Sequence, residues 1–139
     1  MKVRNVMHKG MTCVELSSPV GEIAKHMRDD NVGAIAVCAE SKLVGIVTDR
    51  DITCRAVADS RDLAQMTAQD LMTKKVFCCS PDDDIAVAIK TMETKKVRRL
   101  VVTDREKAIV GILSLGDVSH KATRKRGGEV LRAVSAHHR

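Results

Sequence analysis

The chain has 139 residues, of which 24 are Lys or Arg and 18 are Asp or Glu, and its formal net charge is +6. This length fits one compact domain or two small fused halves and leaves little room for a separate catalytic domain. Apolar residues make up 44% of the chain, enough to build a core. No apolar run approaches the ~20 residues of a membrane span, and no signal peptide is recognisable, so we expect a cytoplasmic protein.

The positive charge is concentrated in the C-terminal tail. Residues 121–139 contain six Lys and Arg and a single acid, Glu129, which amounts to +5 of the +6. The preceding 120 residues are therefore nearly neutral. The basic excess is a property of the tail and not of a folded nucleic-acid-binding face.

An internal repeat organises the rest of the chain. The two copies align at an offset of 65 residues, which becomes 66 after one inserted residue. The aligned segments are 6–13 with 71–78, 20–27 with 85–92, 32–37 with 97–102 and, after the insertion, 44–52 with 110–118.

Each copy predicts an early strand followed by an amphipathic helix. Apolar residues recur at i, i+3, i+4 and i+7 from Val20 in the first copy and from Ile85 in the second. Ser18 and its counterpart Asp83 are residue types that cap helix N-termini, and Pro19 occupies the favoured first helical position.

A hairpin and a second helix complete each copy. Short apolar runs at 34–38 and 43–47, and again at 99–103 and 109–113, predict two hairpins, which are followed by helices from Asp49 and Leu115. Each copy is therefore β-α-β-β-α, and the fold class is mixed α+β. Because so small a sheet cannot bury its apolar face alone, we expect the copies to pack sheet to sheet about a pseudo-twofold axis, with two related clefts between them. The predicted boundaries are 1–60 for the first copy, 61–70 for a linker, 71–123 for the second copy and 124–139 for the tail.

The number and spacing of the cysteines predict reduced thiols. Their number is odd and no C-x-x-C pair occurs, so buried thiols acting as small apolar groups are favoured over disulfides or a metal site. Adjacent cysteines on one strand would point to opposite faces. The five residues are Cys13, Cys38, Cys54, Cys78 and Cys79.

Both copies carry Gly-x-x-[Ser/Thr]-x-x-Asp at the predicted junction of hairpin and second helix. One interpretation is structural, since a hydroxyl at the N-cap and an acid three residues later form nearly a capping box. The other is binding of a nucleotide: the helix start suits a phosphate, the acid can accept from both ribose hydroxyls, and glycine permits close backbone approach. Occurrence at two equivalent places favours binding. The residues are Gly45, Thr48 and Asp51, then Gly111, Ser114 and Asp117.

The repeat ending in Val44-Gly-Ile-Val-Thr-Asp-Arg-Asp-Ile52 and Val110-Gly-Ile-Leu-Ser-Leu-Gly-Asp-Val118 resembles a tandem pair of cystathionine-β-synthase (CBS) domains, the Bateman module, from about residue 3 to residue 123. The resemblance implies a non-enzymatic sensor of AMP, ADP or ATP, with NAD(H) or S-adenosylmethionine as further candidates. It also implies a homodimer that reports energy state to an effector protein.

The same resemblance implies site residues. Asp51 and Asp117 would hold ribose, and Thr48 and Ser114 would contact phosphate. The second site lies near Lys95, Lys96, Arg98 and Arg99, which predicts that it is the better polyphosphate site, and Arg50 or Arg99 could reach the neighbouring ligand. A solvated helix end is the alternative for Lys95 and Lys96 and is favoured for Lys95. The remaining residues, mainly against adenine, would be Thr12, Cys13, Val14, Gly33, Ala34, Ile35 and Arg50, then Val76, Phe77, Cys78, Arg98, Arg99 and Leu100.

Other functions have less support in the sequence. No nucleophile elbow, phosphate loop or zinc-protease motif occurs, so we expect no catalytic or metal-ligating residue. The tail could act as a basic arm for nucleic acid, although Phe77 is the single aromatic residue available for base stacking; a helix over 129–136 that docks on a dimer is the alternative. The cysteines with His137 and His138 could form a metal or redox sensor.

Overall fold

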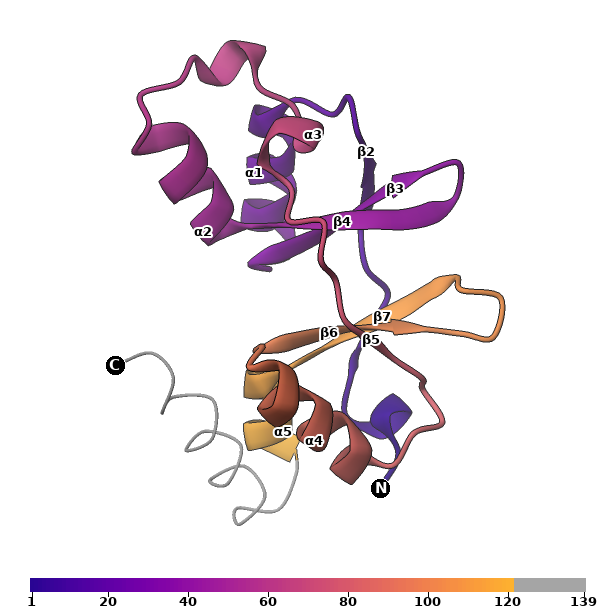
Figure 1. Ribbon diagram of the computed structural model, residues 1–139. Helices are drawn as coiled ribbons and strands as arrows, with labels where there is room; N and C mark the ends of the chain where they lie inside the picture. The colour runs from indigo at the N-terminus through magenta and orange to yellow at the C-terminus, as the bar shows by residue number, and fades with distance from the viewer. Residues whose placement is uncertain (122–139) are drawn as a thin grey trace. The chain divides into compact units, whose positions relative to one another are not determined.

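The computed structural model describes residues 1–121, which form five α-helices and two β-sheets (Figure 1). The mixed α+β fold class is confirmed. The described residues divide into two compact units. We call residues Thr12–Val76 the central unit, and Met1–Met11 together with Phe77–Lys121 the split unit.

The central unit contains the first copy of the repeat. Its sheet has the order β2-β3-β4, with β2 parallel to β3 and β3 antiparallel to β4. Ile23, Ile35, Val47 and Leu71 are fully buried in its core. Its elements are β2 (Cys13–Glu15), α1 (Val20–Asp30), β3 (Ala34–Ala39), β4 (Lys42–Thr48), α2 (Asp49–Ile52), a π-helical turn (Thr53–Val57), a 3₁₀ turn (Leu63–Gln65) and α3 (Ala68–Leu71).

The split unit contains the second copy. Its sheet has the order β1-β7-β6-β5, with β5 parallel to β6 and the other pairs antiparallel. Val3, Val6, Leu100 and Leu113 are fully buried in a core of its own. Its elements are a 3₁₀ turn (Val3–Asn5), β1 (His8–Lys9), β5 (Cys78–Cys79), α4 (Ile85–Lys95), β6 (Arg99–Thr103), β7 (Ile109–Ser114) and α5 (Leu115–Lys121).

The predicted β-α-β-β-α order is confirmed in both copies, and so is their correspondence in register. Cys13 pairs with Ala36 in the central unit, and Cys78 pairs with Val101, each residue 65 positions later, in the split unit. Both hairpins also shift register at the same place, after Val37 and after Val102.

The first residues of each repeat pack on the other repeat, and we call them the exchanged segments, residues 1–9 and 68–73. In the split unit, β1 pairs with β7 through His8 and Ile112, and the Ile85 amide donates to the Met1 carbonyl at 2.8 Å. In the central unit, Thr73 and Ile46 exchange backbone hydrogen bonds of 2.8 and 3.0 Å. The sequence repeats and the compact units are therefore different divisions of the chain.

The predicted caps of the first helices are wrong by one residue. The N-caps are Pro19 and Asp84. The Ser18 hydroxyl instead accepts from the Glu15 amide at 3.0 Å, and the Asp83 carboxylate accepts from the Ser80 amide at 3.0 Å. Both side chains therefore close the turn before the helix, and the first helical amides donate to main-chain carbonyls, Val20 to Met66 and Ile85 to Met1.

The two glycines of the repeated motif, Gly45 and Gly111, allow the exchanged segments to pack closely against the strands. A Cβ on Gly111 would lie 2.5 Å from the backbone oxygen of His8. A Cβ on Gly45 would lie 2.8 Å from the Met72 sulfur and 3.0 Å from the backbone oxygen of Thr73. The predicted close backbone approach is therefore present, but it is made by the protein's own chain.

We predict that Gly111→Ala lowers the free energy of unfolding by about 1–3 kcal/mol, because β1 must move to relieve the overlap. Gly45→Ala should cost less, since its shortest contact is the flexible Met72 side chain. Urea denaturation measures both.

Gly21→Ala is the matched control, because a Cβ there meets nothing within 4 Å. In helix α1 this change should stabilise by about 0.5–1 kcal/mol. A Gly111→Ala protein as stable as the wild type would contradict the docking of β1 against Gly111.

Candidate functional site

Thr48 and Asp51 form the first junction, where β4 ends and α2 begins. The Thr48 hydroxyl accepts from the Asp51 amide at 3.1 Å, and Oδ2 of Asp51 accepts from the Thr48 amide at 2.9 Å. The predicted capping box is confirmed. It leaves the hydroxyl proton of Thr48 available for donation to a ligand.

Ser114 and Asp117 form the second junction, between β7 and α5, in the same way. The Ser114 hydroxyl accepts from the Asp117 amide at 3.0 Å, and Oδ2 of Asp117 accepts from the Ser114 amide at 2.9 Å. Within residues 1–121, no group donates to Oδ1 of Asp117. This junction therefore offers both a hydroxyl donor and a carboxylate oxygen.

Other predicted residues lie beside the first junction on neighbouring strands. The Asp49 amide donates to the Gly33 carbonyl at 3.1 Å, and Ala34 pairs with Thr48. The Ala36 amide donates to the Thr12 carbonyl at 3.3 Å, which continues the arrangement onto β2. The structure thus places 33–35 at the start of β3, next to Thr48 on β4, and 12–14 at the start of β2, one strand further away.

Equivalent residues surround the second junction. The Leu115 amide donates to the Arg98 carbonyl at 2.8 Å, and Arg99 pairs with Ser114. The Val101 amide donates to the Phe77 carbonyl at 3.0 Å. Val76, which we predicted beside Phe77, belongs to the central unit.

Several residues that we predicted to contact adenine have buried side chains. Ile35 and Leu100 are 0% exposed and belong to the two cores. Val14 and Ala34 are also buried. These residues therefore contribute to the two cores and offer little or no exposed surface to a ligand.

The basic residues of the second copy lie at the end of α4. Lys95 is its last residue, and its Nζ lies 5.6 Å from the centroid of the Phe77 ring, a cation–π contact. This is the solvated helix end that the sequence suggested for Lys95. Arg98 is exposed and Arg99 half-buried, and Arg50 of the first junction is exposed.

The sequence analysis missed two groups that contact Asp51. Nε of Arg55 lies 3.8 Å from Oδ1 of Asp51, and the Thr73 hydroxyl lies 3.4 and 3.5 Å from the two carboxylate oxygens. The i,i+4 spacing of Asp51 and Arg55 is a recognisable signal for the first contact. The sequence gives no such signal for Thr73, because this residue lies 22 positions from Asp51, at the start of the second repeat.

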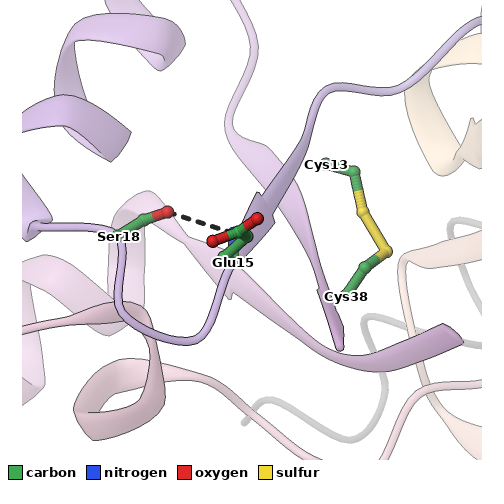
Figure 2. The surroundings of a disulfide bond; sticks show 4 residues. All are labelled: Cys13, Glu15, Ser18 and Cys38. Atoms are coloured by element: carbon green, nitrogen blue, oxygen red, sulfur yellow. Dashed lines mark hydrogen bonds between the residues drawn. A yellow bond between two sulfur atoms is a disulfide. The ribbon is translucent and has the colours of Figure 1, made fainter. Parts of the chain in front are cut away.

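The prediction of five reduced thiols is wrong for two of them. Cys13 on β2 and Cys38 on β3 form a disulfide, with their Cα atoms 6.1 Å apart (Figure 2). Parallel pairing of the strands brings together cysteines that are 25 residues apart and belong to no sequence motif.

Cys54, Cys78 and Cys79 are free, as predicted. Cys78 is exposed and Cys79 buried, which confirms their opposite orientation on β5. Burial, the Asp83 carboxylate and Cys78 raise the pKa of Cys79 to about 12. The expectation of burial is wrong for Cys54 and Cys78.

The chain matches the CBS domain family twice, over residues 3–56 and 68–123. It belongs to the CBS-domain family. A relative in Bacillus subtilis, the uncharacterized protein YlbB, is 35% identical over 137 residues, which cover 96% of this chain and 91% of that protein. The tandem arrangement of two CBS domains is therefore shown.

Solved CBS-domain structures share the fold. The CBS pair of protein MJ0100, in complex with methylthioadenosine and S-adenosyl-L-methionine, is 25% identical with a TM-score of 0.77 and covers 93% of this chain and 98% of that chain. Protein PAE2072 from Pyrobaculum aerophilum, complexed with AMP, is 22% identical with a TM-score of 0.78 and covers 98% of this chain and 99% of that one.

Some predictions concern groups outside these junctions. Among residues 1–121, no helix has the length and apolar character of a membrane span, and no cluster of three or more His, Cys, Asp or Glu could hold a metal. The basic tail 124–139, the helix over 129–136 and the pair His137 and His138 lie outside the described residues.

We predict that Cys38→Thr lowers the free energy of unfolding of the CBS pair by about 3 kcal/mol, because the cross-link restricts the unfolded chain over a loop of 25 residues. Threonine is the natural counterpart, since Thr103 lies 65 residues later. Denaturation with and without dithiothreitol measures the effect, which should vanish under reduction.

Cys78→Ser is the control and should leave stability nearly unchanged. Alkylation of the folded, unreduced protein should label Cys54 and Cys78 and spare Cys79, whose raised pKa leaves little thiolate at pH 8. Rapid labelling of Cys13 without a reductant would contradict the disulfide.

Proposed function

We propose that this CBS pair is a non-enzymatic regulatory module that binds an adenosine-containing ligand. AMP, ADP and ATP are the first candidates, with NAD(H) and S-adenosylmethionine after them. The ribose hydroxyls donate to the junction aspartate, the junction hydroxyl donates to phosphate, and the adenine lies along the adjoining strands. A homodimer then passes ligand occupancy to an effector protein.

The observation that carries the proposal is the second junction. Asp117 keeps one carboxylate oxygen without a donor in the described chain, beside a serine hydroxyl that still has its proton to donate. Two acceptor positions on one ionised carboxylate match the two adjacent hydroxyls of a ribose. The main chain of 98–100, at the start of β6, adjoins this group, and that of 77–78, at the start of β5, lies one strand further away.

The comparisons support the same ligand class. The MJ0100 pair was solved with methylthioadenosine and S-adenosyl-L-methionine, two ligands that share an adenosine with intact ribose hydroxyls. PAE2072, which has the same fold, was solved with AMP. The shared chemistry is the nucleoside, and the groups attached to it distinguish the candidates.

We predict that Asp117→Asn weakens binding of AMP or S-adenosylmethionine about 100-fold, because the ribose hydroxyls lose a charged acceptor. Asparagine keeps an oxygen for the Ser114 amide, so the cap is preserved. Isothermal titration with AMP, ATP, NADH and S-adenosylmethionine measures the loss.

Asp59→Asn, an exposed acid outside both junctions, is the control and should bind normally. Mass spectrometry of ligand released from freshly purified, denatured protein identifies the natural ligand. Wild-type affinity in Asp117→Asn together with lost affinity in Asp51→Asn would contradict the assignment.

A regulatory role predicts a change of shape or of partner affinity on binding, since a ligand shifts an equilibrium only through different affinities for its two states. Small-angle scattering should therefore differ between the free protein and protein saturated with the ligand found above. Identical scattering and identical partner affinity in both states would contradict a switch.

A further inference from the structure

The two junctions share a backbone but differ in what surrounds the carboxylate. The Asp51 side chain is only 12% exposed and has a guanidinium and a hydroxyl beside it. Asp117 is half-buried, and within the described chain its carboxylate accepts only from the Ser114 amide. The repeat is therefore symmetric in fold and unequal in chemistry.

Arg55 is held firmly in place beside Asp51. Its Nη1 donates to the carbonyls of Leu71 and Met72 at 3.1 and 3.2 Å. These carbonyls lie at the C-terminal end of α3, where the helix leaves them without partners of its own. The guanidinium thus bridges the end of α3 and the Asp51 carboxylate, and moving it away would leave two carbonyls without this donor and the carboxylate without its cation.

The second repeat lacks both groups. The position equivalent to Arg55 is Lys121, and the position equivalent to Thr73 is His8. Both side chains are exposed, and no hydrogen bond or ion pair joins either to Asp117 within residues 1–121. Within the described residues, a ribose approaching Asp117 therefore has no cation to displace.

A ribose approaching Asp51 meets a different situation. The carboxylate already has the Arg55 guanidinium 3.8 Å away, and both of its oxygens lie near the Thr73 hydroxyl. Hydrogen bonds to a carboxylate are strong because the acceptor is charged, and a neighbouring cation offsets part of that charge, so a ribose diol gains less here. Breaking a partly buried ion pair adds a further cost.

We propose that Arg55, with Thr73, closes the first junction to ribose, so that each chain binds one adenosine-containing ligand, at Asp117. This inference rests on the proposed function and names the residue that decides which junction is used. Arg55 acts as a specificity-determining residue through its hold on Asp51.

The test is the stoichiometry of AMP binding, with S-adenosylmethionine in a parallel series. Titration of the wild type should give one equivalent per chain, Asp51→Asn should leave it unchanged, and Asp117→Asn should abolish it. Adding Arg55→Gln to Asp117→Asn frees Asp51 and should restore binding at least about 10-fold tighter than Asp117→Asn alone. Adding Asp51→Asn as a third change should remove it again.

Controls separate release of Asp51 from a general loosening of the fold. Glutamine can still donate to the α3 carbonyls, Arg55→Met serves as a second uncharged variant, and thermal melting establishes that each is folded. Lys121→Gln, the matched change in the second repeat, should restore nothing in the Asp117→Asn background. 2′-Deoxy-AMP should bind the restored site weakly, because it lacks a ribose hydroxyl.

Each outcome decides a different claim. Two equivalents in the wild type, falling to one in Asp51→Asn, would overturn the closure by Arg55 and leave the proposed function standing. Folded double variants that bind no better than Asp117→Asn would also overturn it. A wild type that binds none of AMP, ATP, NADH and S-adenosylmethionine would overturn the proposed function and this inference together.

Discussion

Each compact unit of this CBS pair depends on a segment that the chain attaches to the other repeat. Val3 and Val6, at the start of the first repeat, are fully buried in the core built on the second. Leu71, at the start of the second repeat, is fully buried in the core built on the first. Because a three-stranded sheet and two helices bury too little apolar surface alone, neither repeat is a complete folding unit without this exchange.

The exchange also shapes the two junctions. It brings His8 against Gly111 and Met72 and Thr73 against Gly45, which is why glycine occurs at both places. In the central unit it delivers the α3 carbonyls that hold Arg55 and the Thr73 hydroxyl beside Asp51. The same segment that completes the core therefore determines what a ligand meets at the carboxylate.

The repeats have diverged where the side chains leave the shared backbone. The first copy joins β2 to β3 through Cys13 and Cys38, whereas the second has Cys78 and Thr103 at the equivalent positions and no cross-link. Arg55 and its counterpart Lys121 differ similarly, since Arg55 contacts Asp51 and no described contact joins Lys121 to Asp117. The two junctions thus have nearly identical capping geometry but different surroundings. The first lies in a disulfide-linked unit with a guanidinium beside its carboxylate, and the second has neither within the described residues.

The sequence by itself determined the repeat, the order of elements and the capping boxes, because these follow from local periodicity and from hydrogen bonds between residues three or four positions apart. Thr48 with Asp51 and Ser114 with Asp117 were predicted correctly for that reason. The tertiary structure alone decided the exchange of leading segments, the disulfide and the contacts of Asp51. Cys38 lies 25 residues from Cys13 and Thr73 lies 22 from Asp51, and such pairs meet only after strands from distant parts of the chain have taken their places in the sheet.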